Sequence, residues 1–370
     1  MIIKDREYFE KLKNIPQFPL HIHWDGSIPA HEIWKLAQKK GMKLTLPEKD
    51  RLGKKIEYRS PDDMLIKDED HLREFFMDLN RYHIVDVFSI PVSFMQTKDD
   101  LIFMAKAHCR YLKSQNVPYA ETRFAPQYHT RQGLSVEQVV GYALEGFEAG
   151  LEETGVDVKL IISLGRESDS HVTEDIVRRI LSFKEKLVGI DLATEERGNP
   201  PEKHKKAFEL TFDTSLKRTV HAGEMCEEEE NLKNIHTAIT ELRADALGHA
   251  IPLFKRYYKG FDLIEAMLER NIRLEANPVS NHYLFNYAIT YHNLDELVDL
   301  GLLVTVNPDD PAMWPNGDQV HSLYFLGEVY GNSFIERVTK NAVISAWGLS
   351  DEQKASYLEK INDSLKILRE

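Results

Sequence analysis

Short apolar runs rich in β-branched residues alternate with helical patterns along nearly the whole chain. Eight of these runs are predicted to be strands: Leu20–Trp24, Tyr119–Phe124, Val158–Leu164, Val188–Leu192, Arg218–His221, Ala246–His249, Ile272–Ala276 and Leu302–Val306. The helices predicted between them are His31–Lys40, Lys98–Ser114, Val136–Thr154, Glu174–Lys186, Lys203–Thr214, Asn231–Leu242, Asp262–Arg270 and Leu294–Leu300. Strands alternating with helices of this length indicate βαβ units and a parallel sheet. Eight such units favour an α/β fold in which the sheet closes into a (β/α)8 TIM barrel.

The chain is longer than this architecture requires. It has 370 residues, whereas a (β/α)8 barrel typically needs about 250. We assign the additional residues to an insertion after the first strand, Thr45–Met95, and to extra helices after Gly317 at the C-terminal end. One helix is predicted within the insertion, over Arg73–Val87. Because no Gly/Ser-rich or Pro-rich linker divides the sequence, residues 1–370 are interpreted as a single domain.

Charge and hydropathy argue against several classes of protein. The chain carries 47 Lys and Arg against 60 Asp and Glu, a net charge of −13, whereas nucleic-acid-binding domains carry clustered positive charge. No run approaches the roughly eighteen apolar residues of a membrane helix. The charged segment Met1–Lys13 lacks the apolar stretch of a signal peptide. We therefore expect a cytoplasmic protein with no nucleic-acid or membrane partner; its oligomeric state is not defined by the sequence.

Histidines and acidic residues stand at the carboxyl ends of the predicted strands. His21 and His23 are two residues apart on the first strand, so both side chains point to the same face. His221 ends the fifth strand, His249 ends the sixth, and Asp309-Asp310 follow the eighth. In a barrel these ends converge on one mouth, where the active sites of this fold are built. Two or three histidines with a carboxylate are a usual ligand set for zinc.

Each of these features taken alone has a more common structural explanation. A lone His-x-His is usually a surface or packing pair, and Asp-Asp-Pro is typical of a turn or a helix cap. The metal site is favoured because every feature lies at the end of an independently predicted strand. The other histidines lack this support and are interpreted as surface or structural residues. His282 is the nearest of them to the site, because it follows Asn281 at the end of a predicted strand.

Seven short motifs resemble those of the adenosine deaminase family, in the same order and with similar spacing, from Leu20 to about Gly348. They are His21-Ile-His-Trp-Asp-Gly-Ser27, Glu121-Thr-Arg-Phe-Ala-Pro126, Gly189-Ile-Asp-Leu-Ala193, His221-Ala-Gly-Glu224, Gly248-His-Ala250, Asn277-Pro-Val-Ser-Asn281 and Asn307-Pro-Asp-Asp-Pro311. The most specific part is His-Ala-Gly-Glu together with Asn-x-Asp-Asp-Pro.

The resemblance implies a zinc-dependent hydrolase of purine metabolism that converts adenosine or 2′-deoxyadenosine to the 6-oxo product, inosine in the case of adenosine, with release of ammonia. It implies one Zn²⁺ held by His21, His23, His221 and Asp309. The further roles that it implies are a proton donor to purine N1 (Glu224), a residue that orients or deprotonates the attacking water (His249), a hydrogen-bond partner of N7 (Asp310), a backbone N–H that reaches N3 (Gly189) and a contact to a ribose hydroxyl (Asp25).

Chemistry gives these roles independent reasons. Zinc lowers the pKa of bound water from about 15.7 to roughly 7, so hydroxide becomes available at neutral pH. Attack on C6 places electron density on N1, and Glu224 can protonate N1 only if its pKa is raised. The competing chemistry is that of two-metal barrel amidohydrolases, which commonly bridge their metals with a modified lysine at the end of the fourth strand. Since Val188–Glu196 contains no lysine, one metal ion is favoured.

Four residues depart from the family pattern: Trp24, Ala250, Asn277 and Pro308 stand where Leu, Gly, Cys and Ser or Thr are usual. The bulk of Trp24 predicts a narrowed or reshaped sugar pocket. Relatives that act on free adenine usually carry Glu at the position of Asp25, and those acting on N6-methylated AMP usually carry Asn, so Asp25 favours a nucleoside. Arg123 is interpreted as a structural ion-pair partner. The alternatives are a deaminase of free adenine or of a modified nucleoside such as 6-aminodeoxyfutalosine, and a catalytically silent binding protein on the same barrel.

Overall fold

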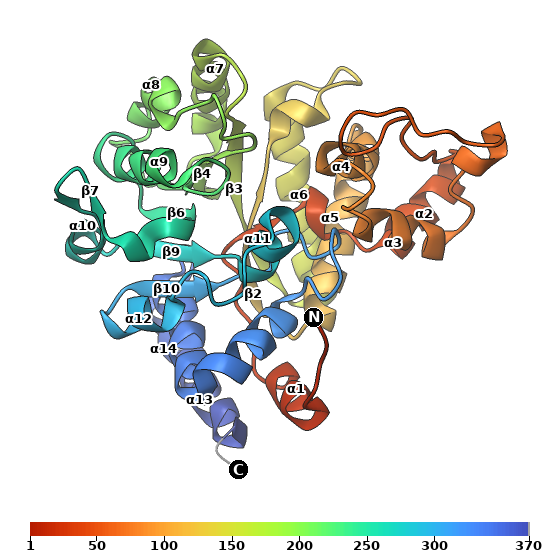
Figure 1. Cartoon of the computed structure of the whole chain (residues 1–370). Coiled ribbons are helices and arrows are strands. Elements are labelled where there is room, and N and C mark those ends of the chain that lie inside the picture. The colour runs from red at the N-terminus through yellow and green to blue at the C-terminus, as the bar shows by residue number, and fades with distance from the viewer. Residues whose placement is uncertain (369–370) are drawn as a thin grey trace.

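The computed structural model describes residues 1–368, and its centre is a barrel of eight parallel strands (Figure 1). The strands are β1 (Ile22–His23), β2 (Tyr119–Phe124), β3 (Asp157–Gly165), β4 (Leu187–Ala193), β5 (Lys217–Ala222), β6 (Ala246–His249), β9 (Arg273–Ala276) and β10 (Leu303–Val306). Neighbouring strands pair in the order in which they occur along the chain. The predicted α/β barrel is confirmed, and each of the eight strands lies within two residues of its predicted bounds.

The barrel closes between its first and last strands. Ile22 forms a parallel bridge with Asp309. The amide of His23 donates to the carbonyl of Asp309 at 2.9 Å, and the amide of Asp309 donates to the carbonyl of His21 at 3.2 Å. Three residues of the predicted site, His21, His23 and Asp309, therefore take part in the contact that closes the barrel.

Helices cover the outside of the barrel, as a parallel sheet requires. They are α2 (Ala30–Lys40), α5 (Lys98–Ser114), α6 (Val136–Thr154), α7 (Ser170–Ile180), α8 (Lys205–Glu209), α9 (Glu228–Thr240), α10 (Leu263–Arg270) and α12 (Leu294–Asp299). The bounds of α5 and α6 are those predicted. The helix predicted over Glu174–Lys186 begins earlier, after Asp169, and ends at Ile180. The one predicted over Lys203–Thr214 is a 3-10 turn followed by the short α8.

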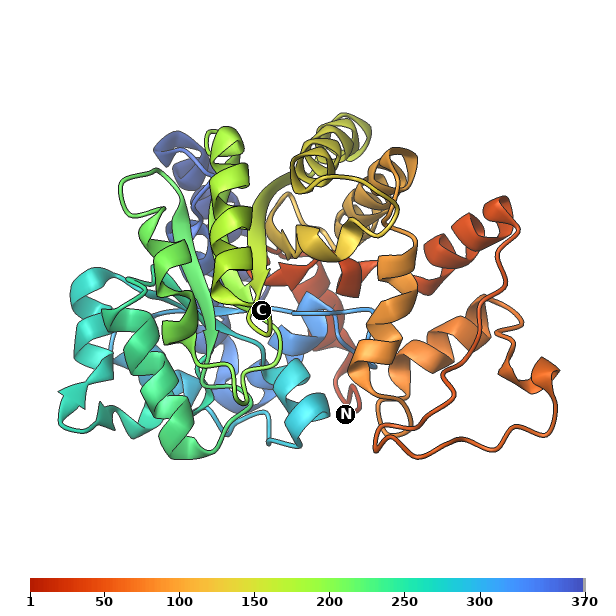
Figure 2. The ribbon, with the colours of Figure 1, turned by 90° about the horizontal axis from the view of Figure 1, so that it is seen from above.

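The insertion after β1 contains two helices, α3 (Glu69–Met77) and α4 (Ile84–Ser93), and Figure 2 shows it at one side of the barrel. The prediction of one helix over Arg73–Val87 is therefore wrong. The side chain of Asp68 caps the start of α3, and the imidazole of His83 accepts from the amide of Val85 at the start of α4. The cap at His83 lies at the break between the two helices and satisfies the amide of Val85, which a continuous helix would bond internally.

Other elements complete the fold. The extra C-terminal helices predicted after Gly317 are present as α13 (Gln319–Ser345) and α14 (Asp351–Ser364). The helices α1 (Arg6–Lys13) and α11 (Pro278–Phe285) were not predicted. Nor was the antiparallel ribbon of β7 (Tyr257–Tyr258) and β8 (Phe261–Asp262), whose turn places Lys259 and Gly260 at positive φ, as tight hairpin turns require.

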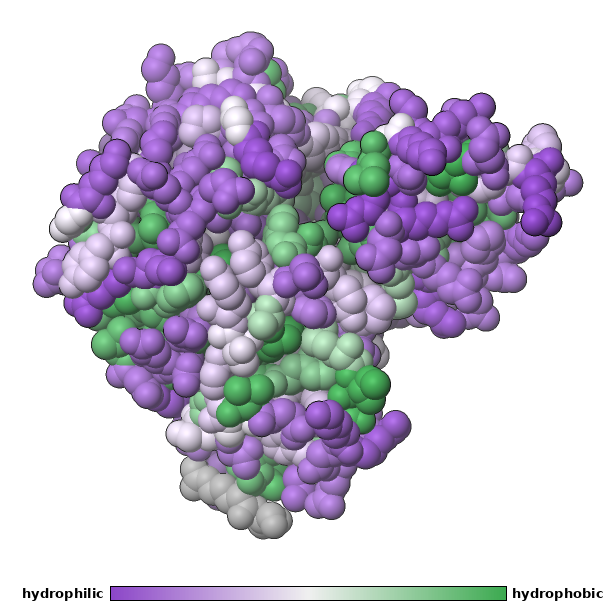
Figure 3. Space-filling view, in the orientation of Figure 1, coloured by the Kyte–Doolittle hydropathy of each residue, from purple (hydrophilic) through white to green (hydrophobic). Residues whose placement is uncertain are grey.

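Hydrophilic residues dominate the face of the molecule drawn in Figure 3, with smaller hydrophobic patches between them. Within residues 1–368, no helix has the length and apolar character needed to cross a membrane. The cytoplasmic location stays a prediction. So does the single domain over residues 1–370, the last two of which lie outside the described part of the chain.

Candidate active site

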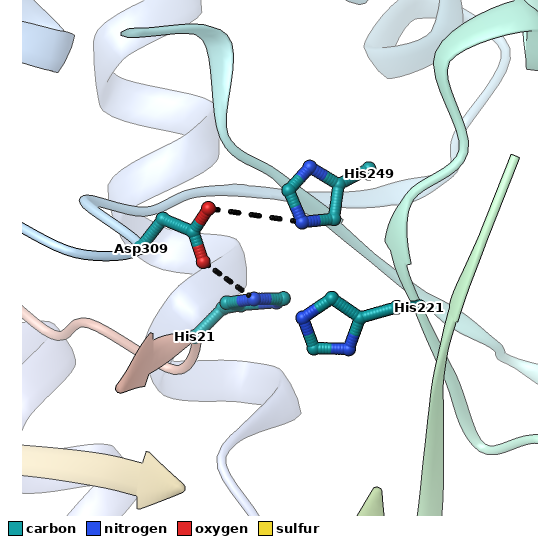
Figure 4. Close-up of side chains that lie close together, drawn as sticks. All are labelled: His21, His221, His249 and Asp309. Atoms are coloured by element: carbon teal, nitrogen blue, oxygen red, sulfur yellow. Dashed lines mark ion pairs between the residues drawn. The ribbon is translucent and has the colours of Figure 1, made fainter. Parts of the chain in front are cut away.

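The four side chains predicted to bind metal converge at the carboxyl ends of β1, β5 and β10. The Nε2 atoms of His21 and His23 lie 3.0 and 3.3 Å from Oδ1 of Asp309. The Nε2 atoms of His23 and His221 are 3.2 Å apart. Figure 4 shows how His21, His221 and Asp309 face one another across this space, together with His249. The strands thus bring together residues that are far apart in the sequence, as the strand-end pattern predicted.

The geometry of this cluster fits a divalent metal ion. Four ligands around a tetrahedral zinc at about 2.0–2.1 Å would be about 3.3 Å apart, close to the distances above. Moreover, Nε2 of His21 and Oδ1 of Asp309 are buried and have no hydrogen-bond partner. Such atoms are costly to bury unless something compensates them, and a cation between imidazole lone pairs and a carboxylate would do so.

His249 belongs to the same cluster, although it was not predicted as a ligand. Its Nε2 lies 3.8 Å from Oδ2 of Asp309. His21, His221, His249 and Asp309 form one compact group of potential metal ligands, and His23, Asp309 and Asp310 form another. The Nε2 atom of His249 is also 3.2 Å from the side-chain amide of Asn277. The Nε2 contacts of His23 are with members of the predicted ligand set, His221 and Asp309, whereas Nε2 of His249 is shared with Asn277, so His23 is the better candidate for a ligand.

Buried carboxylates hold two of the imidazoles in place. Nδ1 of His21 contacts Oε2 of Glu275 on β9 at 2.9 Å, and Nδ1 of His221 contacts Oδ1 of Asp191 on β4 at 2.9 Å. A carboxylate that accepts the Nδ1 proton leaves the Nε2 lone pair free and fixes the ring, as in many metal sites. Sequence reasoning missed both acids. Their only signal was an acidic residue inside a predicted buried strand.

Arg123 lies between these two carboxylates. Its Nη2 is 2.8 Å from Oε2 of Glu275 and its Nη1 is 3.6 Å from Oδ2 of Asp191, and all three side chains are fully buried. Burial alone would raise the pKa of Asp191, but the charges of His221 and Arg123 outweigh it and lower that pKa. Similarly, Arg123 and Arg273 hold the pKa of Glu275 well below its ordinary value despite its burial. Arg123 is thus a structural ion-pair partner, as predicted.

Glu224 and His249 lie side by side next to the metal cluster. Glu224 follows β5, is only 4% exposed, and its Oε1 is 3.5 Å from Nδ1 of His249. Burial raises the pKa of Glu224 to about 7, with Asp309 and Glu196 adding to the effect. A carboxyl group with this pKa is protonated to a substantial extent at neutral pH, so it can act as an acid there.

The imidazole of His249 is held by two asparagines. Its Nδ1 is 2.8 Å from Oδ1 of Asn281, whose amide nitrogen in turn contacts His292 at 3.2 Å. Asn281 and His282 lie in α11, so the expectation that they stand at a strand end is wrong. His282 contacts the carbonyl of Tyr287 at 2.9 Å. The family pattern has Cys at the position of Asn277, and here its amide is the group that contacts His249.

Asp25 and Asp310 complete the mouth of the barrel. Asp25 begins a 3-10 turn directly after β1 and is 8% exposed. Asp310 follows β10, and its Oδ1 is buried without a hydrogen-bond partner. A side chain at Gly26 would overlap this carboxylate, so only glycine allows the approach. Burial raises the pKa of both acids, and the charges of Asp309 and Asp25 raise that of Asp310 further.

Three residues at the strand ends adopt a left-handed backbone conformation that side chains disfavour. His249, Ala250 and Asp309 have φ values of 63°, 41° and 60°. Such strain in residues other than glycine is concentrated at functional sites. At Ala250 the backbone accommodates a Cβ where the family has Gly, as expected from the sequence.

Gly189 is not part of this site, and its predicted contact with purine N3 is wrong. It is the third residue of β4 and pairs with Lys217, the first residue of β5. His221 lies four residues further along β5, or about 13 Å at 3.3 Å per residue. A Cβ at Gly189 would lie 2.6 Å from the carbonyl of Lys217. The motif containing Gly189 was correctly placed on a strand, but this residue lies at the end opposite the mouth.

Trp24 does not narrow the pocket. Its indole is fully buried, with ring centroids 5.1 Å from Phe124 on β2 and 5.0 Å from Phe147 on α6. It therefore fills the layer between the barrel and its helices. Space for a ligand is present elsewhere: a cavity of about 370 Å³ beside Glu224 is lined by Met225, Ile251, Phe285 and Tyr287, among others.

Comparison with known proteins agrees with this geometry. The family model described as adenosine deaminase matches residues 16–364. An adenosine deaminase of Clostridium acetobutylicum is 30% identical over 95% of this chain and 99% of its own length. An adenine deaminase of Wolinella succinogenes is 28% identical over 95% of this chain and 98% of its own length. The crystal structure of an adenine deaminase from Arthrobacter aurescens superposes with a TM-score of 0.77 at 25% identity, covering 95% of this chain and 99% of that one.

The match to the family model extends over nearly the whole chain. The relatives that cover its full length include deaminases of both adenosine and adenine. The substrate therefore differs among proteins of this type, while the hydrolysis of a C–N bond in a cyclic amidine is common to them. The chain belongs to the adenosine deaminase family.

Proposed function

We propose that the protein is a zinc-dependent hydrolytic deaminase of adenosine or 2′-deoxyadenosine. In the proposed reaction water adds its oxygen to C6 of the purine, the C6–N bond breaks, and inosine and ammonia form from adenosine. The observation that carries the proposal is the position of a buried, protonatable Glu224 beside a cluster of unpaired metal-ligand atoms. A binding protein without turnover would need neither of these features.

The metal ion would be held by His21, His23, His221 and Asp309. When bound, zinc supplies a Lewis acid that lowers the pKa of water into the neutral range. The role of the protein is to keep the Nε2 atoms directed inward, through Glu275 behind His21 and Asp191 behind His221.

Three acidic or basic groups would act on the substrate. Glu224 donates a proton to N1 as electron density develops there, which its raised pKa permits. His249, beside Asp309 and held by Asn281, orients the attacking water and accepts its proton. Asp310 hydrogen-bonds N7, and burial with two neighbouring carboxylates keeps its pKa raised, so that it carries a proton to donate.

Metal analysis of the native protein is expected to give close to one zinc per chain, because the two groups of potential ligands share Asp309 and therefore form a single site at the mouth of the barrel. The measurement is elemental analysis of protein purified without chelator, normalised to chain concentration. Chelation should abolish deamination, and zinc should restore it. A reproducible value of two metals per chain would contradict the mononuclear site.

The preferred substrate is inferred from Asp25, because relatives of this chain are named for adenosine as well as adenine. The side chain of Asp25 is buried at the mouth of the barrel, where it would accept a hydrogen bond from a ribose hydroxyl. Free adenine offers no hydroxyl, so the carboxyl group would be left unpaired. An unpaired buried polar group costs about 1–3 kcal/mol.

We expect kcat/KM for adenosine to exceed that for adenine by roughly ten- to a few-hundredfold, which corresponds to this free energy. Asp25→Ala should lower the preference, and Asp25→Asn, which keeps an acceptor in the same place, should retain part of it. The assay follows absorbance with adenosine, 2′-deoxyadenosine, adenine, AMP and 6-aminodeoxyfutalosine. A wild type that prefers adenine, or a preference unchanged in Asp25→Ala, would show that Asp25 does not select the sugar.

A further inference from the structure

Glu196 is a buried carboxylate that none of the roles above uses. It lies three residues beyond the end of β4 and is 1% exposed. Its Oε1 accepts from the amide of Gly223 and from Nδ2 of Asn234 on α9, both at 2.9 Å. Its Oε2 accepts from the amides of Glu224 and Met225 at 2.9 and 3.0 Å. A carboxylate with four good donors is unlike a surface acid and is fixed in position.

Three of these donors are consecutive backbone amides, and the middle one belongs to Glu224. Residues 223–225 connect β5 to the loop before α9, and Gly223 has a φ of 81°, which turns the chain sharply there. The next residue is held from the other side, because the side-chain amide of Asn231 both accepts from the amide of Cys226 and donates to its carbonyl. The backbone that carries Glu224 is therefore clamped at each residue.

Arg166 compensates the charge of Glu196 and links it to the metal cluster. Its Nη1 is 3.6 Å from Oε1 of Glu196, and both side chains are buried. Its Nη2 donates to the backbone carbonyl of His221. The pair thus connects the loop of Glu224 to the strand that carries a candidate metal ligand, and a buried ion pair of this kind is retained where it fixes a geometry.

The geometry points to Glu196 as a positioning residue that holds Glu224 at the correct place and angle for proton transfer to the purine. This inference rests on the proposed role of Glu224. Within residues 1–368, the side chain of Glu224 is anchored through its backbone and its proximity to His249 alone, so the position of the carboxyl group follows that of the amides of residues 223–225. Misplacement of a reacting group by about 1 Å can cost on the order of a hundredfold in rate.

The test compares Glu196→Ala, Glu196→Gln and Glu195→Ala in the zinc-loaded enzyme, with whichever adenine compound the wild type deaminates best. Glu196→Ala is expected to lower kcat about ten- to a hundredfold, with KM and zinc content close to wild type. Glu196→Gln should lose less, because its remaining oxygen still accepts from two of the amides. Glu195 is the matched control, since its half-exposed carboxylate pairs only with Arg197 and holds no part of the loop.

A double-mutant cycle separates positioning from general damage. If Glu196 acts through Glu224, adding Glu196→Gln to Glu224→Gln should lower kcat by less than twofold, whereas a structural role would make the two losses multiply. The inference would be overturned if the reductions in kcat of the two single variants multiplied in the double variant. It would also be overturned if Glu196→Gln had the kcat of wild type. These outcomes are distinct from failure of the proposed function, which would appear as a zinc-loaded wild type that deaminates none of the five compounds.

Discussion

Glu224→Gln is expected to lower kcat by at least a hundredfold while leaving zinc content unchanged. Transfer of a proton by a positioned side chain typically contributes 10²–10⁴-fold, and an amide cannot deliver one to N1. The side chain of Glu224 is 4% exposed and does not belong to either group of potential metal ligands. Its replacement by an isosteric amide should therefore change the chemistry and preserve the fold.

The measurement is steady-state kinetics on protein of verified zinc content. Purine binding should persist, because the amide of Gln can still donate a hydrogen bond to N1. Glu227→Gln is the matched control: Glu227 lines the same cavity but is exposed, and its loss should leave kcat nearly unchanged. A Glu224→Gln enzyme close to wild type would show that the proton comes from another group.

Arg123→Met is expected to lower the free energy of unfolding by about 3–5 kcal/mol, the usual consequence of breaking a buried ion pair by removing one partner. The guanidinium is fully buried between Glu275 and Asp191. Without it, Asp191 and Glu275 both lose a positive charge inside the barrel, and Glu275 keeps its ion pair with Arg273. Both carboxylates orient imidazoles of the candidate metal site. Because native domains are stable by only about 5–15 kcal/mol, this is a severe loss.

Denaturant unfolding of the zinc-loaded protein measures this effect. Arg179→Met provides the comparison, since Arg179 pairs with Glu137 and Asp175 on the outside of the barrel and its side chain is 43% exposed. Exposed pairs contribute about 0–1 kcal/mol, so this variant should unfold close to wild type. If both variants lost the same free energy of unfolding, the interior ion pairs would contribute no more to stability than those on the surface.

The barrel was predictable because its signals are local and repeated. Most strands are short runs of buried residues followed by a helix, as in Tyr119–Phe124, where all six residues are buried. The candidate metal ligands could be predicted because they lie at the carboxyl ends of strands. The topology of a barrel brings these ends together independently of the conformation of the loops. The helices of the insertion were less predictable, because the break between α3 and α4 coincides with a cap formed by His83, and His83 is not a typical capping residue.

The residues behind the site could not be identified from one sequence. Asp191, Glu275 and Glu196 are acids whose role depends on which face of a strand they occupy and on partners far away in the chain. Gly189 is a different kind of error. The motif was correctly placed on a strand, but Gly189 lies too far from the carboxyl end of that strand for its amide to reach a ligand at the mouth of the barrel. Trp24 was expected near the sugar because of its neighbour Asp25, yet the chain turns between them and sends the indole into the core.

The closure of the barrel at Asp309 has a consequence for the order in which the protein matures. During synthesis the three histidines emerge first, and the carboxylate that completes the set is supplied only when the last strand docks against the first. Contacts between residues so distant in sequence form late in folding, because the chain loses the entropy of closing a long loop before the contacts contribute favourable free energy. An ion that binds only the assembled set would stabilise the closed barrel by a free energy that grows with the logarithm of its concentration over its Kd. Binding of a metal ion at the proposed site would therefore stabilise the contact between the first and the last strand of the barrel, after the last strand has been synthesised.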